Sequence, residues 1–380
     1  MVCLCWKLII GTWILLAVGV VWFQHKILTK KLLYLSHMDP QVQVKYRGTE
    51  RYDFANIVHW KTYLGGALLV PPRLVLSIPF LLVLFVLVYI PKLLFGVDVK
   101  TGQTPRGKFY INWQVGVFVL MRPLLLCLGI TKLKKVKVSI KDFIADYKSS
   151  KPANSVAPIV VSNHVSILDM FYYLTKNVSF LSKDTVAKSP FVGMFAVARQ
   201  NIFLDRTSLE DRERVLQLIK TRAARVNSHG DISPLLIFPE GTVSNGRSLI
   251  GFKKGAFQSG DLIKIYMLKY NPEPGSYAFT MSNMSTLYSV ILSMSQLTNT
   301  IEEIEFLEPF DPEYIYQRDQ IDRNHEDAWK HVAAAVKNLM AQVSGFQSVE
   351  TSMRETKEFE KVSADINSQV LESQKRAKDD

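Results

Sequence analysis

The stretch SNHVSILDM, residues 162–170, follows directly on the apolar run APIVV, residues 157–161. The apolar run is rich in β-branched residues and predicts a buried strand, and the polar residues after it predict a turn into a helix. Asn163 and His164 would lie in that turn. Asp169 would lie in the first turn of the helix, five residues after His164. A strand, turn and helix in this order indicate an α/β fold.

The pair His164 and Asp169 fits two interpretations. In the structural one, Ser166 is the N-cap of the helix and Asp169 completes a capping box, with its carboxylate at the positive end of the helix dipole. In the functional one, the carboxylate accepts a hydrogen bond from one imidazole nitrogen, which fixes the tautomer and leaves the other nitrogen as a base. The stretch alone does not decide between them.

From about residue 132 onward, short apolar runs alternate with amphipathic segments, which predicts an α/β domain with a mixed sheet flanked by helices. Strands are predicted at 136–140, 157–161, 234–238 and 262–268, and helices at 209–226 and 326–342. The last 35 residues are polar with mixed charge and predict a frayed helix or a disordered tail.

Three apolar runs precede this domain. Residues 8–23 carry no charge and approach the roughly 17 to 25 residues that a membrane helix needs, which indicates a signal anchor. Residues 74–91 are also uncharged and form the strongest candidate span. Residues 109–130 are interrupted by Arg122 and Pro123, so this run could cross a membrane, dip into it or lie along its surface.

These patterns divide the chain into a membrane region with about two transmembrane helices (1–108), a domain that opens with a membrane-associated helix (109–345) and a polar tail (346–380). Lysine and arginine are dense after the first apolar run and at 132–137. Because positively charged loops stay in the cytoplasm, three crossings from an outside N-terminus place the domain in the cytosol. The lysines at 132–137 fit a solvated strand edge, a contact with anionic headgroups, or both.

The net charge of +12 fits nucleic acid, an anionic membrane or phosphorylated substrates as a partner. The apolar N-terminal region favours the membrane. Aromatic residues concentrate in the apolar runs instead of interleaving with lysines, which argues against nucleic acid.

Several chemistries lack their residues in this sequence. The three cysteines, Cys3, Cys5 and Cys127, lie in or beside apolar segments, so neither a disulfide framework nor a metal site is expected. The sequence contains no HExxH helix, paired CxxC, P-loop or G-x-S-x-G elbow. Metal-dependent hydrolysis, phosphoryl transfer and serine-hydrolase chemistry are therefore not indicated.

A second informative stretch, LLIFPEGTVSNGRSLIGFKKGAF, covers residues 235–257. In its Pro-Glu-Gly-Thr turn, Gly241 would let backbone amides approach a ligand closely, and Glu240 offers an acceptor for hydroxyl or basic partners. The cations that follow, and that suit a phosphate, are Arg247, Lys253 and Lys254. A surface turn with solvated charges is the alternative interpretation.

A third stretch, ARQNIFLDR (198–206), places Arg206 after a short apolar run, where a surface pairing with Asp205 or Asp211 is the alternative. The three motifs together, NHxxxxD (163–169), IFLDR (202–206) and FPEGT (238–242), resemble those of the glycerophospholipid acyltransferase family, which contains bacterial 1-acylglycerol-3-phosphate acyltransferases. The resemblance covers roughly residues 110–345. Within the family, the stretches 161–170, 237–257 and 301–312 look most like those of lysophosphatidylcholine and lysophosphatidylethanolamine acyltransferases.

The resemblance implies roles for individual residues. His164 would be the general base that deprotonates the acceptor hydroxyl, and Asp169 would orient and charge-balance it. Arg206 would hold the phosphate of the acceptor, and Lys183 would have a weaker phosphate or donor role. The implied substrate-binding residues are Asn163, Lys183, Arg206, Glu240, Gly241 and Thr242.

The implied reaction transfers a fatty acyl chain directly from acyl-CoA to the free hydroxyl of a lysophospholipid. Acyl-CoA is a co-substrate, and neither a metal nor a cofactor is expected. Backbone amides near the first turn or Gly241 are candidate donors to the oxyanion. The resemblance implies an integral membrane protein of the endoplasmic reticulum.

Three alternatives remain open: synthesis of phosphatidic acid from lysophosphatidate, acyl exchange between phospholipids, and a noncatalytic membrane protein that binds anionic lipid or a partner.

Two features depart from the family pattern. Ile265 occupies a position at which many members carry proline, which bears on the acyl-chain pocket. The tail has no D-x-[DN]-x-[DN]-G loop, so direct regulation by calcium is not expected.

Overall fold

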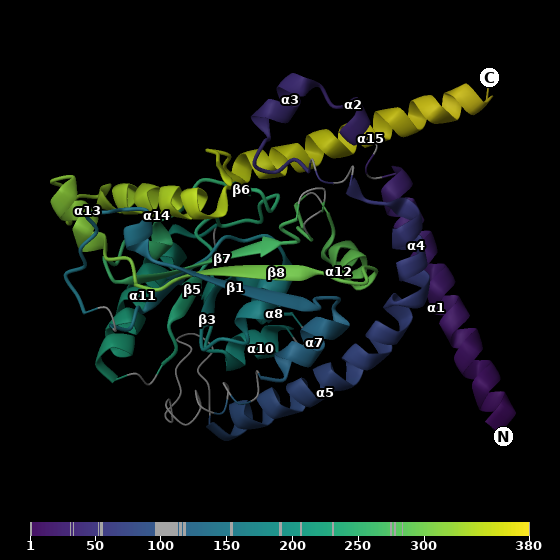
Figure 1. Ribbon diagram of the computed structural model, residues 1–380, viewed down its shortest axis with the longest axis horizontal. Helices are drawn as coiled ribbons and strands as arrows, with labels where there is room; N and C mark the ends of the chain where they lie inside the picture. Colours follow the sequence, from purple (N-terminus) through teal and green to yellow (C-terminus); the bar gives the residue numbers. More distant parts are fainter. Residues whose placement is uncertain are drawn as a thin grey trace.

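The centre of the protein is a seven-stranded mixed sheet in the order β1-β8-β7-β2-β5-β3-β4 (Figure 1). The computed structural model describes residues 2–30, 32, 34–51, 53, 56–95, 113, 116, 119–152, 155–189, 192–205, 207–229, 232–273, 276, 279–282 and 284–379. The strands of this sheet are β1 (Lys132–Val138), β2 (Ile159–Val161), β3 (Ser179–Lys183), β4 (Ile202–Leu204), β5 (Leu235–Ile237), β7 (Ile263–Tyr270) and β8 (Thr300–Phe306). A separate pair consists of β6 (Ser248–Leu249) and β9 (Gln347–Ser348).

Five strands, from β7 to β4 in the sheet order, run in one direction. β8 pairs antiparallel with β7, and β1 pairs parallel with β8. Because side chains alternate along a strand, β2 sends Val160 into one core and Ile159 and Val161 into the other. Both faces of the sheet are therefore covered, and the predicted α/β fold with a mixed sheet flanked by helices is confirmed.

Helices cover each face of the sheet (Figure 1). One face carries α7 (Met121–Cys127), α8 (Ile167–Tyr173), α10 (Val192–Ala198) and α12 (Thr286–Met294), and the other carries α11 (Leu209–His229), α13 (Pro312–Arg318) and α14 (Ala328–Ser344). The short helices are α9 (Asp184–Ala187), η2 (Ile140–Asp142) and η3 (Lys254–Ala256). The predicted helices at 209–226 and 326–342 are confirmed as α11 and α14.

The predicted strands at 157–161, 234–238 and 262–268 correspond to β2, β5 and β7, whereas β1 begins four residues before the predicted 136–140. β8 was not predicted, because its glutamates make it read as a polar segment. Inside the sheet these charges are paired: the carboxylate of Glu303 is fully buried and lies 2.7 Å from Nζ of Lys176.

The N-terminal helices are α1 (Val2–Lys30), α2 (Tyr34–His37), α3 (Pro40–Lys45), α4 (His59–Leu68) and α5 (Val70–Phe95). Two helical segments of the described chain are long and apolar enough to cross a membrane, Ile10–Lys30 and Val70–Leu87. α1 and α4 lie side by side, and α5 continues from α4 to pass beneath α7 and α10 (Figure 1).

The third apolar run is not an independent span over residues 119–130. These residues include α7, whose Leu124 and Leu125 are buried in the domain core. The guanidinium of Arg122 donates to the carbonyl oxygens of Ile130 and Thr131, which closes the end of this helix. Most of residues 109–118 lie outside the described residues.

The C-terminal segment forms one continuous helix, α15 (Met353–Asp379), instead of a frayed or disordered tail. Its apolar residues recur at helical spacing, and Phe359 is fully buried against Tyr34 and Tyr46, which belong to the linker between α1 and α4. An ion pair between Lys45 and Glu358 flanks this contact at 2.8 Å. The linker therefore packs against α15 and holds it in place.

We expect Phe359→Ala to release α15 locally, because truncating a buried phenylalanine costs about 3–5 kcal/mol. Limited trypsin digestion of the full chain in detergent would then cleave at Lys361, Lys375 and Arg376 much faster. The matched control, Glu360→Ala, changes an exposed residue on the same turn. Equal cleavage rates for the two variants would contradict the packing role of Phe359.

Candidate active site

His164 and Asp169 lie at the junction of β2 and α8. The side chain of Ser166 caps the helix, and Asp169 returns a hydrogen bond to the backbone of Ser166, so the capping box is present. The same carboxylate contacts the imidazole, with Nδ1 of His164 2.8 Å from Oδ2 of Asp169. The capping box and the imidazole–carboxylate contact therefore occur together, because one carboxylate makes both contacts.

The Asp169 carboxylate is fully buried and accepts hydrogen bonds on both oxygens. Oδ2 accepts from the backbone amides of Val165 at 2.6 Å and Ser166 at 2.9 Å, besides His164. Oδ1 accepts from the hydroxyl of Tyr270 at 2.5 Å. Because the carboxylate acts only as an acceptor here, Nδ1 of His164 carries the proton and Nε2 is the basic nitrogen.

The imidazole is 21% exposed and is held by the loop that contains FPEGT. Its ring stacks on Phe238, with ring centroids 4.2 Å apart and 13° between the planes. The His164 amide donates to Oε1 of Glu240 at 2.8 Å, and its carbonyl accepts from the Ser244 amide at 2.8 Å. The first and third sequence motifs therefore form one unit around His164.

Glu240 lies behind the cavity and not in it. It is fully buried, and its second oxygen accepts from the Ile250 amide at 3.2 Å. Burial raises the pKa of its carboxyl to about 8, although the hydrogen bonds from His164 and Ile250 act in the opposite direction. The structure thus gives Glu240 two backbone partners in place of the hydroxyl or basic partner expected from the sequence.

Asn163 is likewise fully buried and paired with backbone. Its amide nitrogen donates to the carbonyl of Leu268 at 2.9 Å, and its amide oxygen accepts from the Leu268 amide at 2.8 Å. This two-point contact ties the turn after β2 to β7. Asn163 therefore lies next to the His164–Asp169 pair but faces the sheet.

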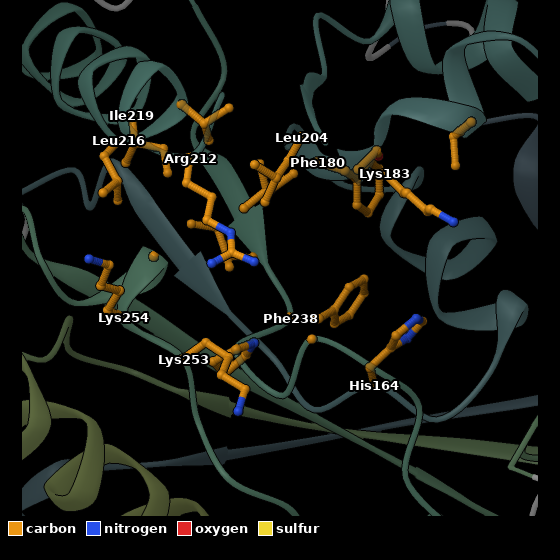
Figure 2. A pocket seen from close by; sticks show the side chains of 18 of the residues that line it. His164, Phe180, Lys183, Leu204, Arg212, Leu216, Ile219, Phe238, Lys253 and Lys254 are labelled. Carbon is orange, nitrogen blue, oxygen red and sulfur yellow. The ribbon is translucent and has the colours of Figure 1, made fainter. Parts of the chain in front are cut away.

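A cavity of about 660 Å³ opens beside His164 (Figure 2). Of the expected site residues, Lys183 and Gly241 line it together with His164, whereas Asn163, Glu240 and Thr242 are outside its described lining. Lys183 ends β3, and Gly241 adopts a left-handed backbone conformation with a φ of 72° in the tight turn. Arg206 lies outside the described residues.

The lining combines an apolar wall with cations. Its apolar side chains include Leu181, Leu204, Val215, Leu216 and Ile219. Its charged side chains are Lys183, Arg212, Lys253 and Lys254, and no carboxylate occurs in the described lining. Figure 2 shows the Arg212 guanidinium directed into the cavity from α11. An apolar chain that carries an anionic group matches this surface.

Three residues of the site were not expected. In the sequence, Arg212 lies on the predicted solvent-exposed face of an amphipathic helix. Phe238 belongs to the FPEGT motif, but the sequence gives it no separate role. Tyr270 follows His164 by more than a hundred residues, so no local pattern connects them.

The backbone amides expected as oxyanion donors already have acceptors. The amide of His164 donates to Glu240, that of Val165 donates to Asp169, and that of Gly241 donates to the carbonyl of Phe238.

The fold and the site define an α/β protein whose His–Asp pair opens on an apolar cavity with cationic side chains, an arrangement suited to acyl transfer. Residues 135–268 match the acyltransferase family model, so this part of the chain is similar to that family. The predicted resemblance is confirmed. Among the described residues, no group of three or more His, Cys, Asp or Glu side chains could hold a metal ion.

The chain is similar to curated lysophospholipid acyltransferases. It is 30% identical over 184 residues to lysophospholipid acyltransferase LPEAT1 of Arabidopsis thaliana, covering 48% of this chain and 43% of the relative. It is 28% identical over 216 residues to lysophosphatidylcholine acyltransferase 2 of Mus musculus, covering 56% and 37%. The chain thus spans less than half the length of these relatives.

Among solved structures, the crystal structure of the 1-acyl-sn-glycerophosphate (LPA) acyltransferase from Thermotoga maritima aligns with a TM-score of 0.34 and 15% identity. The alignment covers 70% of this chain and 98% of that chain.

We expect the stability of the protein to fall as the pH rises between about 4.5 and 8, through Glu240. Its carboxyl holds a proton in the folded state up to about pH 8 but loses it near the ordinary 4.5 when unfolded. The folded state therefore binds more protons in this window, and the free energy of unfolding decreases with pH. Thermal unfolding in detergent across this range measures the slope.

Glu240→Gln removes the titrating group and should flatten that slope, even if the variant is less stable overall. An unchanged slope in the variant would show that other groups cause the pH dependence.

Proposed function

We propose that this protein is a membrane-bound acyltransferase that moves a fatty acyl chain from acyl-CoA to the free hydroxyl of a lysophospholipid of the lysophosphatidylcholine or lysophosphatidylethanolamine type. The observation that carries the proposal is the 2.8 Å contact between His164 and Asp169 at the wall of the apolar cavity. The names of the similar proteins support the class of acceptor.

In the proposed reaction, Nε2 of His164 takes the proton of the acceptor hydroxyl as its oxygen attacks the thioester carbonyl. Asp169 stabilises the imidazolium that forms. The tetrahedral intermediate then expels the thiolate of CoA, which receives the proton from His164. The products are the acylated phospholipid and CoA, and His164 returns to its neutral form.

The cavity suggests where the two substrates bind. The apolar side chains toward α11 would hold the acyl chain, whose burial contributes about 0.8 kcal/mol for each CH₂ group. The cations Arg212, Lys253 and Lys254 would bind phosphate, either of the acceptor headgroup or of CoA. They would also favour the negative charge that develops on the carbonyl oxygen.

We propose that the protein resides in the endoplasmic reticulum membrane with its catalytic domain in the cytosol, where acyl-CoA is available. The two apolar helices support attachment to a membrane. Protease protection of the intact protein in sealed microsomes would test the orientation.

We expect His164→Ala to lower acyl transfer from labelled acyl-CoA by roughly 10²–10⁴-fold, the range for loss of a general base. His331→Ala, which changes an exposed histidine on α14, is the control and should retain full activity. The assay uses purified full chain in detergent with a panel of lyso-acceptors. Undiminished transfer by His164→Ala would exclude His164 as the base. Absence of transfer by the unchanged protein with every acceptor would support a noncatalytic lipid-binding protein, and a preference for lysophosphatidate would indicate phosphatidic acid synthesis.

We expect Arg212→Gln to raise KM about tenfold or more for the substrate whose phosphate it binds, because hydrogen bonds to charged groups contribute about 1.5–3 kcal/mol. A rise for the lyso-acceptor alone assigns Arg212 to the headgroup, and a rise for acyl-CoA alone assigns it to the donor. Arg214→Gln is the control on the same helix, since Arg214 pairs with Asp211 at 2.7 Å. Unchanged KM values for both substrates would remove Arg212 from the binding site.

A further inference from the structure

We infer that Tyr270 is a positioning residue of the acyl-transfer reaction: its hydroxyl fixes the Asp169 carboxylate and, through it, the aim and basicity of the His164 imidazole. This inference rests on the proposed function. No motif of the sequence identifies Tyr270.

The geometry separates the two oxygens of Asp169. Oδ2 receives the backbone amides of Val165 and Ser166 and faces Nδ1 of His164. The hydrogen bond that the structure gives Oδ1 comes from Tyr270, at 2.5 Å. With Oδ2 shared among three donors, this fourth hydrogen bond sets how the carboxylate plane is turned toward the imidazole. Loss of the hydroxyl would leave Oδ1 without this donor and the carboxylate held through Oδ2 alone.

Tyr270 acts as a donor toward Asp169 over the working pH range. Its side chain is almost completely buried, with 4% exposure. Burial, and then the negative charge of Asp169, raise the pKa of the phenol well above its ordinary value of 10. The hydroxyl therefore keeps its proton and disperses the charge of the carboxylate by hydrogen bonding.

The position of Tyr270 in β7 also links the His164–Asp169 segment to the sheet. It ends β7, and Leu268, two residues earlier, holds the amide of Asn163 through both of its backbone groups. The two positions fix the turn before His164 and the helix start after it. β7 thereby holds both ends of the seven-residue segment 163–169, which carries the proposed catalytic pair.

Other titratable groups also surround the pair, from α8, the FPEGT loop, β3 and the segment before η3. They are Tyr172, Tyr173, Lys183, Glu240 and Lys253. None of them is altered when Tyr270 is replaced by phenylalanine, so a difference between the pH profiles of the two proteins isolates the phenol. Tyr173 provides the matched control, because its buried hydroxyl donates to neutral Ser162 at 2.7 Å.

The experiment compares Tyr270→Phe and Tyr173→Phe with the unchanged full chain, by the pH dependence of kcat and KM and by thermal unfolding. For Tyr270→Phe we expect kcat to fall roughly ten- to a hundredfold, the equivalent of one hydrogen bond to a charged group, with both KM values nearly unchanged. The acidic limb of the profile should move to higher pH, because a carboxylate with one donor fewer stabilises the imidazolium more strongly.

For Tyr173→Phe we expect a similar loss of thermal stability without a shift of the acidic limb. A folded Tyr270→Phe protein with unchanged kcat and pH profile would overturn the inference, as would equal limb shifts in the two variants. Failure of the proposed function is distinguishable, since it would appear as full activity in His164→Ala. If His164→Ala loses activity but Tyr270→Phe keeps the kcat and pH profile of the unchanged protein, the inference about Tyr270 is rejected and the proposed function stands.

Discussion

The buried carboxylate of Asp169 is the constraint on which the candidate active site depends. An ionised group without exposure is costly unless donors replace its water, and here two amides, a phenol and an imidazole do so. These donors come from the turn after β2, the start of α8 and the end of β7. The carboxylate that accepts the hydrogen bonds at the start of the helix therefore also holds His164, and a change that moves the helix start moves the imidazole.

The linker between α1 and α4 is hydrogen-bonded to the loops around His164. The side chain of Asn245 donates to the carbonyl oxygens of Arg47 and Glu50, and Arg51 forms a buried ion pair with Asp53 at 2.7 Å. Arg51 also donates to the carbonyl of Thr280, whose hydroxyl donates to Ser244, the residue bound to the carbonyl of His164. A continuous path of hydrogen bonds thus joins a segment assigned to the membrane region (1–108) to the turn that carries His164.

Local signals explain how far the sequence could predict this protein. The junction of β2 and α8 was predictable, because a β-branched run, an N-cap serine and a carboxylate three residues later act within one short segment. The environment of Glu240 was not, because its residue type indicates an acceptor but only tertiary packing makes its partners two backbone amides. The same applies to Arg212, since a helical pattern does not reveal that a cavity lies beside one arginine, and to Tyr270, which reaches Asp169 only through the strand order β7-β2.

The contacts of the linker also restrict how the chain can cross a membrane. If α1 crosses, the residues after it and the domain to which they bind must lie on the same side, so the number of crossings between residues 54 and 119 is even. A single crossing by α5 would put the linker and the domain on opposite sides of the membrane and is excluded.

α5 packs against α7 and α10, its Leu84 is buried, and it leaves Leu82, Val83 and Val86 exposed. These features favour a helix with one face on the domain and the other in lipid. A chain that crosses the membrane once, through α1, and a chain that crosses it three times, as expected from the sequence, place the domain on the same side. The side on which the domain lies therefore depends on the direction of α1 and not on the number of spans.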